Sequence, residues 1–205
     1  MPLPTTFKRR AEAGMLAAAL GLCLGAHAAP VQVSVTDAAG KPLADAAVYV
    51  LLKGQPQAAT GATAEIAQRE RQFVPSVTVV QTGTSVSFPN FDTVRHHVYS
   101  FSPIRSFELK LYAGTPAKPV VFDKPGTAAL GCNVHDQMSA WVHVVDTPLF
   151  GKTDARGEAT LDVPAGQHLL RAWHFSQGET GLPAETALTV ATGAQRAVLR
   201  LKAGG

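Results

Sequence analysis

The sequence predicts an all-β protein built from β-sandwiches. Apolar and polar residues alternate in short runs along the chain, for example over residues 31–37 and 107–112, and this alternation is typical of half-buried strands. The chain contains 14 Pro and 18 Gly, which interrupt these runs with turns. Since no stretch after the first 28 residues keeps a helical period, we expect little helix.

The first 28 residues have the features of a secretory signal peptide. Basic residues at 8–10 precede an apolar run over residues 13–25, and small residues follow up to Ala28, after which we expect cleavage. The apolar run is too short for an ordinary transmembrane helix, and no later stretch is long and apolar enough. Leu22 stands where a lipoprotein needs a small residue before Cys23, which disfavours lipidation. We therefore expect a periplasmic protein with no membrane span after cleavage.

Loss of the signal peptide would leave Cys132 as the single cysteine of the mature chain. No intramolecular disulfide is then possible, and a lone thiol in an oxidising compartment is a liability unless a metal occupies it. The mature chain would carry 15 basic and 14 acidic residues. It has no basic run interleaved with aromatic residues, so nucleic acid is not an expected partner.

Residues 131–145, GCNVHDQMSAWVHVV, place three metal-ligating side chains on one short loop between two strand-like runs. Cys132, His135 and Met138 offer a thiolate, an imidazole and a thioether. The soft sulfur ligands favour copper, and imidazole serves both of its oxidation states. The loop therefore predicts most of a copper electron-transfer site.

A trigonal site of one Cys and two His with a weak axial Met needs one more histidine. Residues 88–101, FPNFDTVRHHVYSF, offer His96 and His97. Neighbouring residues of a strand point to opposite faces, so we expect only one of the two to ligate.

These motifs together resemble the cupredoxins, the family of type 1 (blue) copper proteins. The resemblance covers residues 64–146, and its motifs are FxP at 73–75, VxVVxxGTxVxFxN at 77–90, RHHV at 95–98 and CxxHxxM at 132–138. The sequence motifs are most similar to those of cupredoxin-like proteins of methylamine utilisation. The resemblance implies a Greek-key β-sandwich with one type 1 copper site.

The resemblance also implies a ligand set and a function. The interval from Asn90 to His96 matches the N-x5-H spacing of the small copper carriers, which favours His96 over His97. The implied function is the transfer of single electrons between redox partners, such as a periplasmic c-type cytochrome or a dehydrogenase. The implied copper ligands are His96, Cys132, His135 and Met138, with His97 as the alternative to His96.

A copper ion enclosed by protein ligands leaves no position for a substrate, so we expect no enzyme. The chain has no HxH pattern for an oxygen-binding copper cluster and no CxxCH for covalent haem. Cys132 and His135 could form a nucleophilic pair, but a Met three residues further on fits metal ligation better. Two alternatives stay open: copper storage, delivery or sensing without turnover, and a metal-free module of the same fold.

The segments on both sides of residues 64–146 resemble a second β-sandwich, of the carboxypeptidase-regulatory-like type. Residues 31–52 contain VQVSVTD, the turn AAGKP and LADAAVYVLL, and residues 151–173 contain TDARGEATLDVPAGQHLL. The cupredoxin segment is thus inserted in this sandwich or attached to it. The predicted divisions are a signal peptide (1–28), the first part of the regulatory-like sandwich (29–60), the cupredoxin domain (64–146) and the remainder of the regulatory-like sandwich (148–205).

The other histidines are expected outside the ligand set. His143 shares a strand face with Trp141 and Val145, and we expect it at the surface or behind the ligands. His168 and His174 have no partner at ligand spacing and are expected to be ordinary sandwich residues.

Two polar stretches complete the prediction. Residues 65–72 carry a dense local charge and can form either a helix or an edge strand. Asp136 and Gln137 place polar groups in the ligand loop, which predicts a narrow choice of redox partner or an unusual partner.

Overall fold

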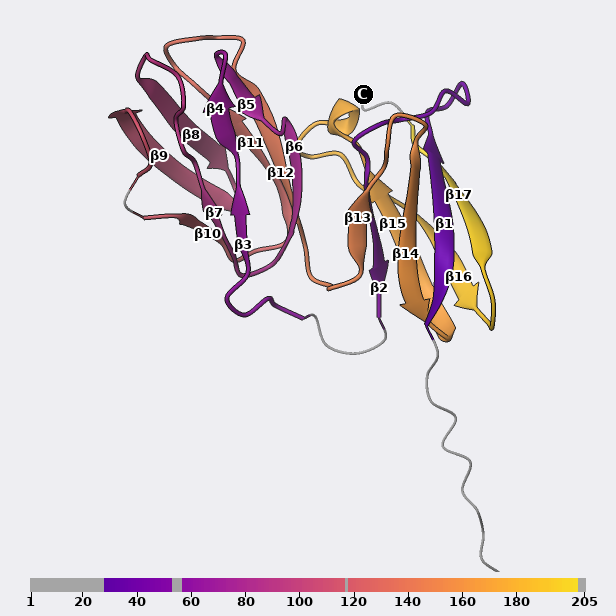
Figure 1. The fold of residues 1–205 in the computed structure, drawn as a ribbon. Helices are drawn as coiled ribbons and strands as arrows, with labels where there is room; N and C mark the ends of the chain where they lie inside the picture. Colours follow the sequence, from indigo (N-terminus) through magenta and orange to yellow (C-terminus); the bar gives the residue numbers. More distant parts are fainter. Residues whose placement is uncertain (1–27, 53–56, 117, 203–205) are drawn as a thin grey trace, which may run out of the picture.

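The computed structural model describes residues 28–52, 57–116 and 118–202. Within them the regular structure is β-strand, apart from the short 3-10 helix η1 (Phe175–Gln177) (Figure 1). The expected all-β fold is confirmed. The predicted signal peptide, except for Ala28, lies outside the described residues. Within these ranges no helix has the length and apolar character needed to cross a membrane.

One sandwich, which we call the flanking sandwich, combines strands from both ends of the described chain. Its two sheets have the orders β14-β1-β17 and β13-β2-β15-β16. In β1 every second residue is buried, with Val31, Val33 and Val35 fully enclosed in the core. The strands are β1 (Ala28–Thr36), β2 (Ala47–Leu51), β13 (Phe150–Lys152), β14 (Glu158–Pro164), β15 (Gly166–Trp173), β16 (Ala184–Val190) and β17 (Gln195–Arg200).

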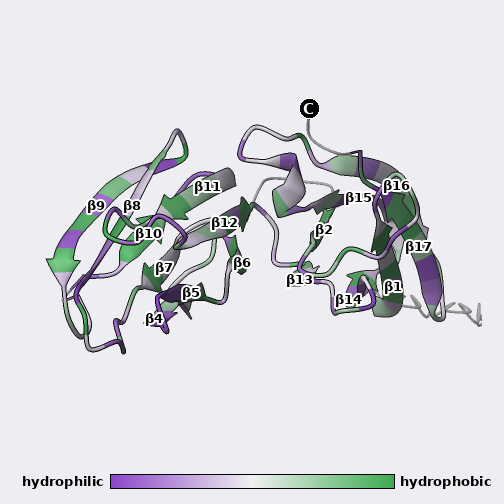
Figure 2. Ribbon diagram, turned by 90° about the horizontal axis from the view of Figure 1, so that it is seen from above, coloured by the Kyte–Doolittle hydropathy of each residue, from purple (hydrophilic) through white to green (hydrophobic). Residues whose placement is uncertain are grey.

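The other sandwich, which we call the central sandwich, is formed by the chain between β2 and β13. It contains a five-stranded sheet of order β6-β12-β11-β8-β9, a three-stranded sheet of order β10-β7-β3, and the hairpin β4-β5. Figure 2 shows hydrophobic and hydrophilic residues alternating along β9, as the sequence predicts. The strands are β3 (Thr63–Glu65), β4 (Ala67–Arg69), β5 (Gln72–Val74), β6 (Val77–Gln81), β7 (Thr84–Ser87), β8 (His96–Ser102), β9 (Arg105–Tyr112), β10 (Val120–Phe122), β11 (Gly126–Gly131) and β12 (Ser139–Val145).

One local expectation is resolved by this topology. Residues 65–72 contain the end of β3 and most of the β4-β5 hairpin, so the helix alternative is wrong. β6 and β7 lie on either side of a turn at residues 82–83 but belong to different sheets. β6 pairs in parallel with β12 and is the edge strand on that side of the five-stranded sheet.

The two sandwiches lie side by side, each with its own apolar core (Figures 1 and 2). A small third cluster joins them, in which Ala47 and Trp173 of the flanking sandwich meet Val77 of the central one. Trp141 packs against this cluster and its ring lies 5.9 Å from that of Trp173. The contact between the sandwiches therefore includes a small buried cluster with two tryptophan rings.

His143 is a buried member of this contact. Its ring stacks on Trp173 at 4.6 Å with an interplanar angle of 6°, and lies 5.5 Å from the ring of Tyr49. Its Nδ1 atom is 2.9 Å from the Thr127 hydroxyl. The surface position considered for His143 is wrong, because the flanking sandwich covers this face of β12. Burial lowers the pKa of His143 from 6.5 to about 4.

We expect His143 to make the protein less stable in acid. Between its unfolded pKa of 6.5 and its folded pKa of about 4, the unfolded chain binds a proton that the folded chain does not, so stability falls as the pH falls. At 1.36 kcal/mol per pKa unit this loss is about 3 kcal/mol. In His143→Phe, which can still stack on Trp173, the decrease from about pH 7 to about pH 4 should be smaller by this amount. Urea unfolding across this range measures it.

His168→Gln is the control, because it removes a histidine of the flanking sandwich outside the contact. It should keep the wild-type pH dependence. A His143→Phe variant that loses as much stability in acid as the wild type would contradict this account of the contact.

Candidate metal centre

The end of β11 and the start of β12 position the ligand loop. β11 ends at Gly131, and residues 132–138 return the chain to β12 through a tight turn in which the Met138 amide donates to the His135 carbonyl over 2.9 Å. Tyr99 of β8 lies directly over Gly131, where an added Cβ would be only 2.6 Å from Tyr99 Cζ. A larger residue immediately before Cys132 would therefore have to displace the Tyr99 ring.

His96 begins β8, and the loop before it is held by Asn90. The buried Asn90 side chain donates to the carbonyls of Val94 at 2.9 Å and Tyr112 at 3.0 Å, and accepts from the Asp92 amide at 2.9 Å. Such side chain to backbone bonds fix a loop without regular structure. His96 itself is fully buried.

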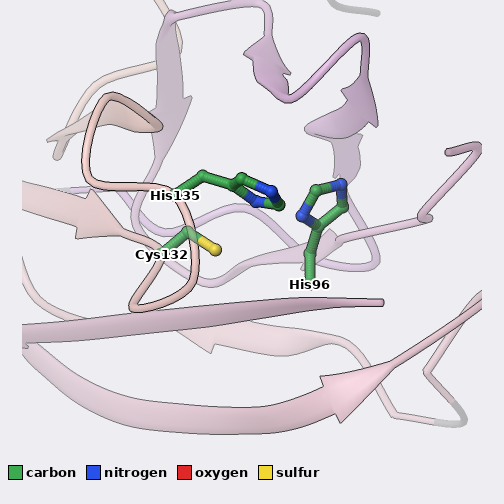
Figure 3. A group of neighbouring side chains, drawn as sticks. All are labelled: His96, Cys132 and His135. Carbon is green, nitrogen blue, oxygen red and sulfur yellow. The ribbon is translucent and has the colours of Figure 1, made fainter. Parts of the chain in front are cut away.

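His96, Cys132 and His135 converge on one point between the two loops. One ligand atom of each residue lies within 4.8 Å of those of the other two, and the two imidazole rings are 5.0 Å apart. Figure 3 shows the three side chains pointing toward one another, one from β8 and two from the ligand loop. Cys132 is buried and is a free thiol.

The Nδ1 atoms of His96 and His135 are buried and find no hydrogen-bond partner in the part of the chain that the structure describes. Buried polar atoms are rarely left in this state. Two imidazole nitrogens and a thiol within a few ångströms form a donor set that suits a soft transition metal such as copper. The residues of the site therefore fit a bound metal ion.

Met138 and His97 are the other two residues considered as ligands. Met138 is buried in the same apolar cluster as Cys132, and its axial role stays a prediction. His97 is buried too, but its Nε2 lies 2.9 Å from a carboxylate oxygen of Glu108 and its ring 5.6 Å from that of Tyr99. The geometry thus leaves His97 outside the converging group.

Asp92 is a residue of the site that the sequence analysis missed. One of its oxygens lies 2.7 Å from His96 Nε2. The backbone amides of Glu70 and Arg71 also donate to this carboxylate, at 2.7 and 2.9 Å. Partial burial opposes the ionisation of Asp92, but these bonds and the His96 ring outweigh it, so the pKa lies below the usual value. The sequence does contain a signal that could have identified Asp92, because it lies four residues before His96.

Gln68 is a second missed residue, fully buried on β4. Its Nε2 donates to the Phe88 carbonyl at 3.1 Å and to the Tyr112 hydroxyl, and Tyr112 in turn donates to Phe88 at 2.7 Å. Burial raises the pKa of Tyr112 to about 12, so this hydroxyl remains a donor. These bonds join β4, β9 and the segment that enters the His96 loop.

The surface around the candidate centre is of mixed character. His135 is partly exposed, and Asp136 and Gln137 face solvent, as the sequence suggested. Val134 in the same loop is 45% exposed, and Phe91 in the His96 loop is 53% exposed with the Arg69 guanidinium 3.8 Å from its ring centre. The apolar side chains make the rim less polar than Asp136 and Gln137 alone imply.

No protein-family model and no curated protein matches the chain. Among solved structures, a copper-containing nitrite reductase from Thermus scotoductus SA-01 is 20% identical with a TM-score of 0.38, over 48% of this chain and 25% of that chain. A purple cupredoxin from Nitrosopumilus maritimus is 22% identical with a TM-score of 0.36, over 40% of this chain and 98% of its own.

Amicyanin from Paracoccus versutus is 16% identical with a TM-score of 0.35, over 47% of this chain and 96% of amicyanin. Each of these likenesses covers less than half of this chain, whereas the nitrite reductase is matched over only a quarter of its own length. At such values the likenesses alone assign neither family nor function.

We expect Asn90→Ala to loosen the His96 loop. The variant loses three hydrogen bonds of a buried side chain, each worth about 1 kcal/mol, so the free energy of unfolding of the metal-free protein should fall by about 3 kcal/mol. Urea unfolding measures this change. Asn133→Ala, next to Cys132 but exposed, is the control and should change the stability by less than about 0.5 kcal/mol. Equal effects of the two substitutions would show that Asn90 does not anchor the loop.

Proposed function

We propose that this chain is a cupredoxin-type protein that binds one copper ion and carries single electrons in the periplasm. The observation that supports it most strongly is the convergence of the Cys132 thiol on two buried ring nitrogens, those of His96 and His135, that have no other partner among the described residues. The proposed ligands are these three residues and, as a weak axial ligand, Met138.

Copper bound there would supply a centre that gains and loses one electron. A fast carrier must hold both oxidation states with little rearrangement, so its ligands need rigid support. His96 begins β8, and Cys132 directly follows β11, so both are fixed by paired strands of one sheet. Four protein ligands would also leave no place for a substrate, so we propose a carrier and no enzyme.

The proposed route for electrons leads through His135. It is the one histidine of the converging group that is partly exposed, and Val134 beside it offers apolar surface for docking. The proposed partner is a redox protein such as a periplasmic c-type cytochrome or a dehydrogenase. The resemblance to proteins of methylamine utilisation makes a methylamine-oxidising chain the first system to test.

Copper handling is the second candidate function. The partial exposure of His135 that favours electron exit would also give a copper ion access to the site from solvent. Storage or delivery would require copper to leave readily in one oxidation state or on contact with a partner. Electron transfer requires tight binding in both states.

We also propose the divisions of the chain. A cleaved signal peptide over residues 1–28 would bring the protein to the periplasm. A cupredoxin domain over residues 64–146 would then sit within a regulatory-like sandwich formed by residues 29–60 and 148–205. The separate cores of the two sandwiches support this division.

Addition of one equivalent of Cu(II) to the mature protein should produce an intense visible thiolate-to-copper band, because Cys132 is its only thiol. Cys132→Ala and His96→Ala should each abolish the band. His97→Ala is the matched control, a neighbouring buried histidine outside the converging group, and should keep it. Retention in His96→Ala with loss in His97→Ala would reverse the ligand assignment. A colourless wild-type protein would favour the metal-free alternative.

The affinities for Cu(I) and Cu(II), together with the rate of electron exchange with a partner, distinguish electron transfer from copper handling. We expect the mature protein to bind both Cu(I) and Cu(II) tightly, and the reduced form to exchange electrons quickly with a periplasmic c-type cytochrome in rapid-mixing experiments. Release of copper on reduction, or slow exchange at every ionic strength, would support copper handling instead.

A further inference from the structure

We propose that Asp92 is a positioning residue of the copper site. Its carboxylate holds the His96 ring with Nδ1 turned toward the metal and favours Cu(II) over Cu(I), while fastening the β4-β5 hairpin beside the site. This inference rests on the proposed copper function, but the orientation of His96 and the hairpin contact belong to the protein itself.

The contact fixes which ring nitrogen of His96 carries the proton. A carboxylate only accepts hydrogen bonds when it is ionised, and the Asp92 oxygen lies 2.7 Å from Nε2. Nε2 must therefore donate, and the lone pair of the neutral ring resides on Nδ1. Nδ1 is the buried atom without a partner in the described ranges, and it belongs to the residue that converges with Cys132 and His135.

Asp92 is itself held in place from a second side. The amides of Glu70 and Arg71, at the turn between β4 and β5, donate to its two oxygens. Both turn residues have positive φ, 53° and 57°, although neither is glycine, and such a backbone is uncommon for these side chains. Successive amides in this conformation form a concave site for an anion, and Asp92 fills it. The hairpin and the His96 ring thus share one carboxylate.

A carboxylate at this position also changes the relative affinity of the site for Cu(II) and Cu(I). When a ligating imidazole donates a hydrogen bond to an ionised acceptor, it becomes a stronger base and binds the metal more tightly. The negative charge lies 2.7 Å from the fully buried His96 ring, so part of its field acts on the proposed metal through the protein. Both effects stabilise the more highly charged Cu(II) relative to Cu(I).

The experiment compares two carboxylate-histidine pairs. Asp92→Asn removes the charge beside His96 and keeps one oxygen, which can accept from Nε2 and from the Arg71 amide, while the Glu70 amide loses its acceptor. Glu108→Gln is the matched control, because Glu108 lies 2.9 Å from His97 Nε2, outside the converging group. Asp92→Asn should reduce the Cu(II) to Cu(I) affinity ratio by about tenfold, a rise of about 59 mV in the reduction potential. Glu108→Gln should change the ratio by less than about threefold.

A metal-free readout tests the positioning role independently. In nitrogen NMR of the wild-type protein at about pH 8, His96 should be a single tautomer protonated at Nε2. Asp92→Ala should give a mixture of tautomers, and the amides of Glu70 and Arg71 should exchange with solvent at least about tenfold faster. Glu108→Gln should leave both signals unchanged.

The outcomes separate the two proposals. Equal copper affinity ratios in Asp92→Asn and Glu108→Gln, or a His96 ring protonated at Nδ1 in the wild type, would overturn the role of Asp92 while the copper function stands. A wild-type protein that binds no copper but has an Nε2-protonated His96 and an Asp92-dependent hairpin would overturn the copper function and leave the positioning role intact.

Discussion

The antiparallel pairing of β11 with both β8 and β12 is the constraint on which the candidate metal centre depends. β11 ends at Gly131, which pairs with Tyr99 inside β8, so the residue after β11 and the first residue of β8 come to the same end of the sheet. Cys132 and His96 occupy these positions although they are 36 apart in the sequence. The ligand loop needs only to turn back into β12 to add His135 and Met138.

The buried polar atoms around the centre follow from this arrangement. Strand ends leave backbone groups without partners, and the side chains of Asn90, Gln68 and Asp92 satisfy many of them. These bonds tie the His96 loop, the β4-β5 hairpin and β9 into one rigid frame. The Nδ1 atoms of His96 and His135 are among the buried atoms that have no partner in the described residues. What sets them apart from others, such as Nδ1 of His97, is that their residues converge with the Cys132 thiol, and this convergence suits a metal ion.

Much of the fold and part of the site could be predicted from the sequence, because they depend on local patterns. Alternation identifies strands such as β9, and the CxxHxxM spacing places Cys132 and His135 on one loop. The burial of His143 could not be predicted, because it depends on which sandwich covers the outer face of β12. The role of Asp92 also depends on tertiary contacts, since the amides that hold it come from a hairpin about 20 residues earlier.

The measurement that tests the central claim most directly is X-ray absorption at the copper edge of the copper-loaded mature protein, recorded in both oxidation states. The account predicts one short copper-sulfur bond and two imidazole nitrogens in Cu(II) and in Cu(I), with little change in bond lengths between them. A copper ion surrounded only by nitrogen and oxygen, or one that loses its sulfur ligand on a change of oxidation state, would contradict it.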